Sequence, residues 1–184
     1  MASQPGRIVL TYEDLLDTPD DGKRYEILEG DLYVTAAPNL AHQHCVGMLL
    51  QIIGPHVRER GLGRIYVAPA DVLLSNISVV EPDLVFISRQ RLDLLTPANV
   101  RGTPDLAIEV LSPSTERTDR GRKMQIYGQY GLEHYWLVDP AARFVEAYRL
   151  VEGRYELAAR ARDDEPLCAP PFPELTIPLA ELWS

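Results

Sequence analysis

Two short apolar segments of the sequence each carry an acidic residue: Val79–Phe86, VVEPDLVF, and Pro104–Leu111, PDLAIEVL. Both segments are rich in β-branched and aliphatic side chains, which predicts a strand in each. Asp83 comes directly before the first strand, and Glu109 lies inside the second. A carboxylate in an apolar strand is costly unless it is paired, hydrogen-bonded or bound to a cation. The two segments therefore predict a polar site built on a β-sheet.

The chemistry of such a site depends on how many carboxylates meet there. Two or three carboxylates that converge from neighbouring strands form a hard-oxygen site suited to Mg²⁺ or Mn²⁺. Asp71, which opens a further predicted strand, is a candidate third acid. The alternative is that each acid caps a turn or pairs with an arginine. The place of Glu109 within its strand favours a functional role, whereas Asp83 alone leaves both possibilities open.

The rest of the chain alternates between short strands and helices. The spacing of apolar and capping residues predicts helices over 11–16, 39–60 and 118–131. It predicts strands over 24–28, 31–35, 64–68, 71–74, 84–87, 106–111, 134–138, 144–150 and 154–159. The Pro-rich segment 166–173 is expected to be extended. This mixture indicates an α/β or α+β fold, with helices packed against a central sheet.

Length and composition limit the possible classes of protein. A chain of 184 residues predicts one domain over 1–184, with a core of about 24–150 and a C-terminal hairpin and tail over 151–184. Hydrophobic residues make up 46% and charged residues 24%, which excludes a disordered or fibrous chain. The net charge of −9 argues against a protein whose whole surface grips nucleic acid.

The expected location of the protein is the cytoplasm. Cys45 and Cys168 are the only cysteines in the sequence and fit a reduced compartment. The sequence contains no apolar run of the roughly 20 residues that a membrane span requires, and its start lacks a signal-peptide pattern.

Lysine is rare in this sequence, so its positions are informative. The 18 basic residues comprise 16 arginines and two lysines. Lys123 lies in the predicted helix that follows the 112–115 loop, from which it could reach a metal-bound water or a phosphate. The alternative is an exposed surface lysine. Arg117, Arg120 and Arg122 precede Lys123 and offer phosphate contacts, unless they form only a solvated helix face.

Three further residues are candidates for the site. His42, near the start of the long predicted helix, could reach a substrate, although a capping or surface role is the alternative. Ser112 and Ser114 are not flanked by a Gly-x-Ser-x-Gly elbow, so they are expected to shape a turn instead of acting as nucleophiles.

Four ordered phrases carry a resemblance to a known family: RYEILEG at 24–30, VEPDL at 80–84, EVLSPST at 109–115 and YWLVDP at 135–140. Together they resemble the Uma-type restriction endonucleases, a bacterial group within the PD-(D/E)xK nuclease superfamily. The resemblance covers roughly residues 10 to 182. The superfamily places a lysine two residues after the glutamate, where this chain has Leu111. In the Uma-type group that lysine lies in the following helix, which corresponds to Lys123.

The resemblance implies a restriction-endonuclease-like fold and a metal-dependent endonuclease acting on DNA, working as a homodimer. It implies that Asp83 and Glu109 hold Mg²⁺ or Mn²⁺, with the Val110 carbonyl as a further ligand. Lys123 would orient the attacking water or neutralise charge on the phosphate. The phrase at 24–30 adds Glu26 as a possible third acid, for which a salt bridge is the alternative.

Other functions stay open at this stage. A non-catalytic nucleic-acid-binding or regulatory module that keeps the nuclease fold is favoured by the net negative charge. Hydrolysis of RNA or of a small phosphodiester is a further possibility. A basic partner protein could also supply the affinity for nucleic acid that the acidic surface lacks.

Overall fold

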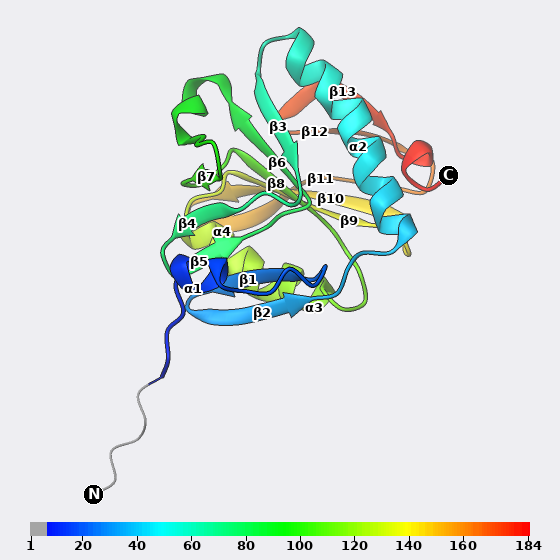
Figure 1. Cartoon of the computed structure of the whole chain (residues 1–184). Coiled ribbons are helices and arrows are strands. Elements are labelled where there is room, and N and C mark those ends of the chain that lie inside the picture. Colours follow the sequence, from blue (N-terminus) through cyan, green and yellow to red (C-terminus); the bar gives the residue numbers. More distant parts are fainter. Residues whose placement is uncertain (1–6) are drawn as a thin grey trace, which may run out of the picture.

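The computed structural model describes residues 7–184 and shows an α+β fold with two mixed sheets (Figure 1). The six-stranded sheet has the order β11 (Arg154–Arg162), β10 (Phe144–Val151), β9 (His134–Asp139), β8 (Leu106–Val110), β6 (Leu84–Ser88), β3 (Gly63–Val67). The five-stranded sheet has the order β2 (Asp31–Thr35), β1 (Arg24–Leu28), β5 (Ser78–Val80), β4 (Val72–Ser75), β7 (Val100–Arg101). A separate hairpin joins β12 (Pro166–Ala169) to β13 (Phe172–Pro178).

The helical elements lie between and around these sheets. They are α1 (Tyr12–Leu16), α2 (Leu40–Glu59), α3 (Glu116–Thr118) and α4 (Met124–Gln129), with 3₁₀ segments over Arg89–Leu94 and Leu179–Leu182. A π-helical turn, Asp119–Lys123, connects α3 to α4. None of the helices in the described part of the chain is long and apolar enough to cross a membrane.

The six-stranded sheet is covered on both faces, because its strands alternate the side to which their side chains point. In β6, Leu84 and Phe86 pack in the cluster that contains α2 and the β12–β13 hairpin. Val85 and Ile87 pack in the cluster that contains α4 and strands of the five-stranded sheet. This two-sided burial explains the continuous apolar runs of the central strands. It also makes any charged side chain on these strands a buried one.

Most of the elements expected from the sequence are confirmed. The capping box at Thr11 and Asp14 opens α1, and the Asn39 side chain caps α2 by accepting the His42 N–H at 2.9 Å. Pro55 lies inside α2 and does not end it. The first hairpin turns at Glu29 and Gly30, which both have positive φ. A Cβ at Gly30 would lie 2.5 Å from Val9 Cγ1, so glycine is required there.

Three features differ from the expectation. The helix predicted over 118–131 is interrupted by the π-helical turn and ends at Gln129. Strands β5 and β7 were not predicted, because segments of two or three residues carry too little periodic signal. The Pro-rich segment is extended, as expected, but it also forms a paired hairpin.

Candidate active site

A cavity of about 230 Å³ lies where β2 leads into α2 and where β8 leads into the 111–115 loop. Its lining brings together five residues singled out in the sequence, from four separate elements and the start of a fifth: Glu26, His42, Asp83, Glu109 and Lys123. Strands β6 and β8 run antiparallel with Leu84 opposite Ile108. Asp83 and Glu109 are therefore the next facing pair beyond the end of the ladder, which explains why distant acids meet here.

Asp83 is a buried carboxylate with a donor on each oxygen. Oδ1 accepts a hydrogen bond of 2.6 Å from Arg24 Nη1. Oδ2 accepts the Val110 backbone N–H at 2.8 Å and lies 3.0 Å from His42 Nε2. Burial works to raise the pKa of Asp83, but the contacts with His42 and Arg24 outweigh it and lower the pKa. Asp83 is therefore held ionised and in one orientation.

Glu109 is also buried, 3% exposed, but its environment favours protonation. Its Oε1 accepts hydrogen bonds from Lys123 Nζ at 3.0 Å and from Tyr127 Oη at 2.9 Å. Burial raises the pKa of Glu109 well above its ordinary value, although Lys123 opposes the shift. Its second oxygen, Oε2, accepts no hydrogen bond within residues 7–184. That oxygen is free to bind a cation.

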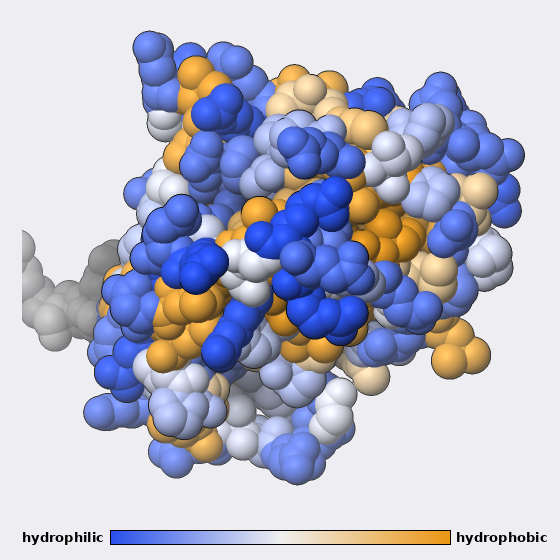
Figure 2. Space-filling view, turned by 90° about the horizontal axis from the view of Figure 1, so that it is seen from above, coloured by the Kyte–Doolittle hydropathy of each residue, from blue (hydrophilic) through white to orange (hydrophobic). Residues whose placement is uncertain are grey.

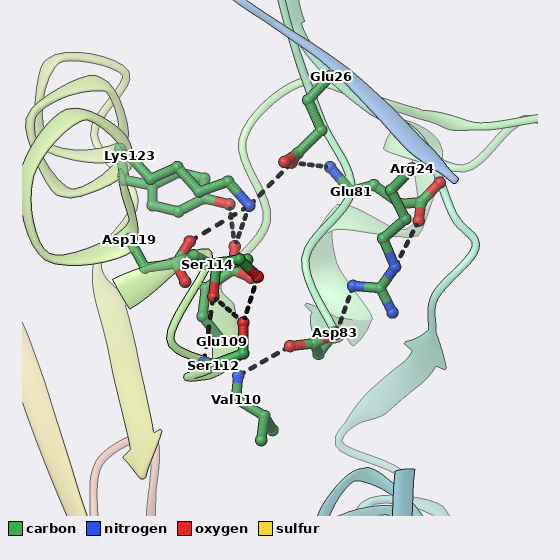
Figure 3. Close-up of polar contacts among 12 residues, drawn as sticks. Arg24, Glu26, Glu81, Asp83, Glu109, Val110, Ser112, Ser114, Asp119 and Lys123 are labelled. Atoms are coloured by element: carbon green, nitrogen blue, oxygen red, sulfur yellow. Dashed lines mark hydrogen bonds and ion pairs between the residues drawn. The ribbon is translucent and has the colours of Figure 1, made fainter. Parts of the chain in front are cut away.

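Lys123 is buried among carboxylates and is not the exposed lysine that the sequence left as an alternative. Its side chain is 5% exposed, and Nζ lies 2.8 Å from Glu26 and 3.0 Å from Glu109, with Asp119 at 3.6 Å (Figure 3). Burial works to lower the pKa of Lys123, but the three carboxylates raise it well above its usual value. The ammonium group is therefore a permanent cation between acids of three different elements.

Arg24 has a matching role on the other side of the cavity. It joins Asp83 to Glu81, whose carboxylate lies 3.2 Å from Arg24 Nε (Figure 3). Glu26 connects the two halves, because its Oε1 accepts the Glu81 backbone N–H at 2.8 Å while it also contacts Lys123. The polar groups form one continuous network.

This network has more carboxylates than permanent cations. In the part of the chain that the structure describes, five acids, Glu26, Glu81, Asp83, Glu109 and Asp119, face two permanent cations, Arg24 and Lys123. Three of these acids have raised pKa values, and a hard divalent cation would stabilise their ionised forms. Within residues 7–184, however, no three His, Cys, Asp or Glu side chains gather closely enough to hold a metal ion between them. The donor set fits Mg²⁺, which is usually held by one or two carboxylates together with water and substrate phosphate.

Val110, Ser112 and Ser114 also line the cavity, whereas Asp71, Arg117, Arg120 and Arg122 do not. Asp71 lies beside Pro69 and Asn99, although its charge adds to the raised pKa of Glu81. Arg120 pairs with Glu146 at 2.8 Å, and Arg122 pairs with Glu29 at 2.6 Å. Neither of these arginines, nor the exposed Arg117, is part of the lining.

Sequence reasoning missed four members of the network, Arg24, Glu81, Asp119 and Tyr127, and all of them except Glu81 carried a weak signal. Arg24 lies two positions before Glu26 and so shares its face of β1. Asp119 and Tyr127 lie four positions before and after Lys123, which is the spacing of neighbours on a helix. Tyr127 has the helical spacing of a core residue, and that spacing gives no sign of its hydroxyl contact with Glu109.

The surplus of carboxyl groups predicts that the free energy of unfolding depends on pH through Glu81. Burial raises its pKa from 4.5 to about 7, with Glu26 and Asp71 adding to the shift and Arg24 opposing it. The folded chain therefore holds this proton over a range where the unfolded chain has lost it. The stability associated with it is present below pH 4.5 and is lost as the pH rises through about 7. We expect Glu81→Gln to flatten this decline in urea denaturation followed from pH 4 to 8.

The change at Glu81 has a matched control. Glu152→Gln alters an exposed glutamate in the β10–β11 turn and should leave the pH profile unchanged. An identical slope in Glu81→Gln and the unchanged chain would contradict the assignment.

Comparison with known proteins now adds to this geometry. The sequence pattern of the Uma2 family, described as "Putative restriction endonuclease", matches residues 11–180. The fold is similar to the crystal structure of a "putative nuclease belonging to DUF820" from Anabaena variabilis, with a TM-score of 0.76 and 20% sequence identity. That alignment covers 95% of this chain and 97% of the other. No curated protein matches the chain.

The family match spans nearly the whole chain, and the structural similarity confirms the nuclease-like fold that the four sequence phrases implied. The chain belongs to the Uma2 family of restriction-endonuclease-like proteins.

Proposed function

We propose that the protein is a divalent-metal-dependent endonuclease that hydrolyses phosphodiester bonds in DNA. The observation that carries the proposal is the pair Glu109–Lys123, buried in a cavity that also holds Asp83 and an excess of carboxylate. A buried lysine with three acids is an expensive arrangement for stability alone. Such a cluster of a lysine and acids in a cavity is expected where a site binds both a metal cation and a phosphate group.

The ligands for the metal would be Glu109, Asp83 and the Val110 carbonyl, with Mg²⁺ preferred and Mn²⁺ as a substitute. When bound, the metal would lower the pKa of a water molecule and polarise the phosphate. Glu109 offers Oε2 without any rearrangement. Asp83 would first have to share an oxygen that Arg24, His42 or the Val110 N–H now occupies.

The chain's own residues account for the other parts of the mechanism. Lys123, fixed by Glu26 and Glu109, would orient the attacking water or donate to a phosphate oxygen as negative charge grows there. The Glu26 carboxylate is the third acid and the base nearest to that ammonium group. His42 is buried at 6% exposure and contacts Asp83, so its role would be to position this carboxylate.

Arginines would bind the substrate on either side of the cleaved bond. Arg24 lines the cavity with its side chain 21% exposed and could exchange Asp83 for a phosphate. Of the three arginines proposed from the sequence, Arg117 has no ion-pair partner within residues 7–184, whereas Arg120 and Arg122 would have to leave Glu146 and Glu29. We propose a homodimer because cleavage of both strands of a duplex usually takes two active sites.

The proposal is tested with supercoiled plasmid and purified protein in Mg²⁺, Mn²⁺ or EDTA. We expect metal-dependent nicking by the unchanged chain and none by Asp83→Ala. Nicking that persists in Asp83→Ala, or that EDTA does not stop, would refute the proposed site. A matched control is Asp139→Ala, which changes an acid at the C-terminal end of β9 that does not line the cavity.

Metal binding should also be visible without catalysis. Because a ligand that binds only the folded chain stabilises it, about 100-fold excess of Mg²⁺ over its dissociation constant should add roughly 2.7 kcal/mol to the free energy of unfolding. We expect a rise in melting temperature with Mg²⁺ or Mn²⁺ that is absent in Glu109→Gln. No rise in either protein would favour the second candidate function, a nucleic-acid-binding or regulatory module that keeps the fold.

The regulatory form of that second candidate is favoured by one observation: Arg120 and Arg122 are already paired with acids and so are not free to hold a nucleic-acid substrate. A module of this kind would bind nucleic acid or a protein partner without metal. The same plasmid and melting experiments separate the two functions.

A further inference from the structure

Four arginines gather where α2 leads into β3, at the end of α2 that is remote from the cavity: Arg58, Arg60, Arg64 and Arg89. Arg58 and Arg64 line an open groove of about 790 Å³ between these two elements. The Arg89 guanidinium lies beside Gly61, and the Arg89 N–H donates to the Leu62 carbonyl at 2.7 Å. Figure 2 looks onto this end and shows strongly hydrophilic side chains gathered next to apolar ones.

These arginines are largely without acidic partners. Arg58, Arg64 and Arg89 form no ion pair within residues 7–184, and Arg60 has only a 3.9 Å contact with Glu174, which is 79% exposed. The chain has 27 acidic and 18 basic residues, so acids were available to neutralise this group. The α2 dipole favours a cation at Arg58 in its last turn, but it does not account for Arg64 or Arg89, which lie on other elements. A local excess of positive charge in an acidic chain is complementary to a polyanion.

The position of the groove relative to the cavity indicates how it would be used. His42 lines the cavity and Arg58 lines the groove, and both belong to α2. Sixteen residues of helix at about 1.5 Å each separate them by about 24 Å. A duplex advances about 3.4 Å per base pair, so this distance corresponds to about seven base pairs.

We propose that Arg58, Arg64 and Arg89 form a second contact surface for the phosphate backbone of duplex DNA, about seven base pairs from the bond cleaved in the cavity. The inference rests on the proposed nuclease function for the position of that bond. This surface would contact phosphates without reading the base sequence, and it would hold a long substrate in place. It also gives an acidic protein a positively charged contact for DNA that is separate from the acid-rich cavity.

The test compares Arg58→Gln/Arg64→Gln/Arg89→Gln with Arg101→Gln/Arg143→Gln/Arg154→Gln. The control set removes the same charge from three exposed arginines that also lack an ion pair within residues 7–184. Binding of a duplex of about 20 base pairs is measured by fluorescence anisotropy in EDTA, so that no cleavage occurs, over a range of salt concentrations. Hydrolysis of bis-p-nitrophenyl phosphate, which is too short to reach the groove, is measured with Mn²⁺.

We expect the first variant to bind the duplex on the order of tenfold more weakly at low salt, with the slope of log K against log salt reduced by about three. The control set should change the slope little, and both variants should hydrolyse the short diester like the unchanged chain. Equal duplex affinity in the two variants would overturn the inference. So would loss of affinity together with a change from dimer to monomer in sedimentation, because the arginines would then serve contact between copies.

Failure of the proposed function gives a different result. In that case the unchanged chain hydrolyses neither plasmid nor bis-p-nitrophenyl phosphate, while the first variant alone loses duplex binding. The arginine surface then stands and the nuclease proposal falls.

Discussion

Lys123→Met is expected to lower the free energy of unfolding by about 3–5 kcal/mol and to abolish hydrolysis, because it leaves Glu26, Glu109 and Asp119 buried without their shared cation. The methionine side chain fills a similar volume, so the loss reflects charge and not a cavity. Urea denaturation measures the first effect, and plasmid nicking measures the second.

Two comparisons make this prediction specific. Lys23→Met changes the other lysine of the chain, which is exposed and, within residues 7–184, pairs with Asp21 alone, and should leave the denaturation midpoint unchanged. Glu26→Gln/Lys123→Met removes one of the stranded carboxylates and should recover part of the lost stability. A double variant no more stable than Lys123→Met would show that the buried charges do not interact as the distances indicate.

Glu109→Gln should have the opposite effect on stability while also abolishing activity. Because burial raises the pKa of Glu109 well above its ordinary 4.5, the folded chain holds a proton on this group at a pH where the unfolded chain has lost it, which destabilises the fold at neutral pH. Glutamine needs no such proton, so the change should raise the free energy of unfolding at neutral pH, and metal-dependent hydrolysis should fall about 100-fold or more. A variant that is both more stable and inactive is the signature of a strained functional group.

The gain in stability from Glu109→Gln should depend on pH. A carboxyl with a raised pKa in the folded state loses its stabilising proton as the pH rises, so the advantage of Glu109→Gln should begin above pH 4.5 and grow towards neutrality. Denaturation midpoints of both proteins at pH 4 and pH 8 measure it. An advantage that is larger at pH 4 would contradict the reasoning.

The sequence predicted the acids of the site better than it predicted the cations that neutralise them. Asp83 and Glu109 stand out because a carboxylate next to or inside an apolar strand breaks a local rule, and such breaks mark functional positions. Lys123 stood out only through the scarcity of lysine, and its burial could not be read from a helix pattern. Arg24 and Glu81 were invisible because a charged residue at a strand end usually faces water.

The arginines show the limit of reasoning from local composition. Arg117, Arg120 and Arg122 are close to Lys123 in sequence, but two of them pair with acids from β10 and the first hairpin turn. Arg58, Arg64 and Arg89 are spread over three elements and meet only after the chain folds. Long-range pairing of charges depends on topology, which no local window contains.

The wide helical turn at Asp119–Lys123 constrains how this chain can tolerate insertions and deletions. Glu109 and Lys123 are 14 positions apart. A π turn holds about one residue more than an α turn, so the loss of a single residue here could restore a regular helix and would suit the backbone. Because a π turn takes up its extra residue with nearly the same rotation about the axis, such a deletion would leave later side chains facing almost as before. The loss of one residue at this turn is therefore compatible with the contacts of Lys123, whereas the loss of one residue from a regular turn of α4 would rotate the side chains that follow it by about 100°.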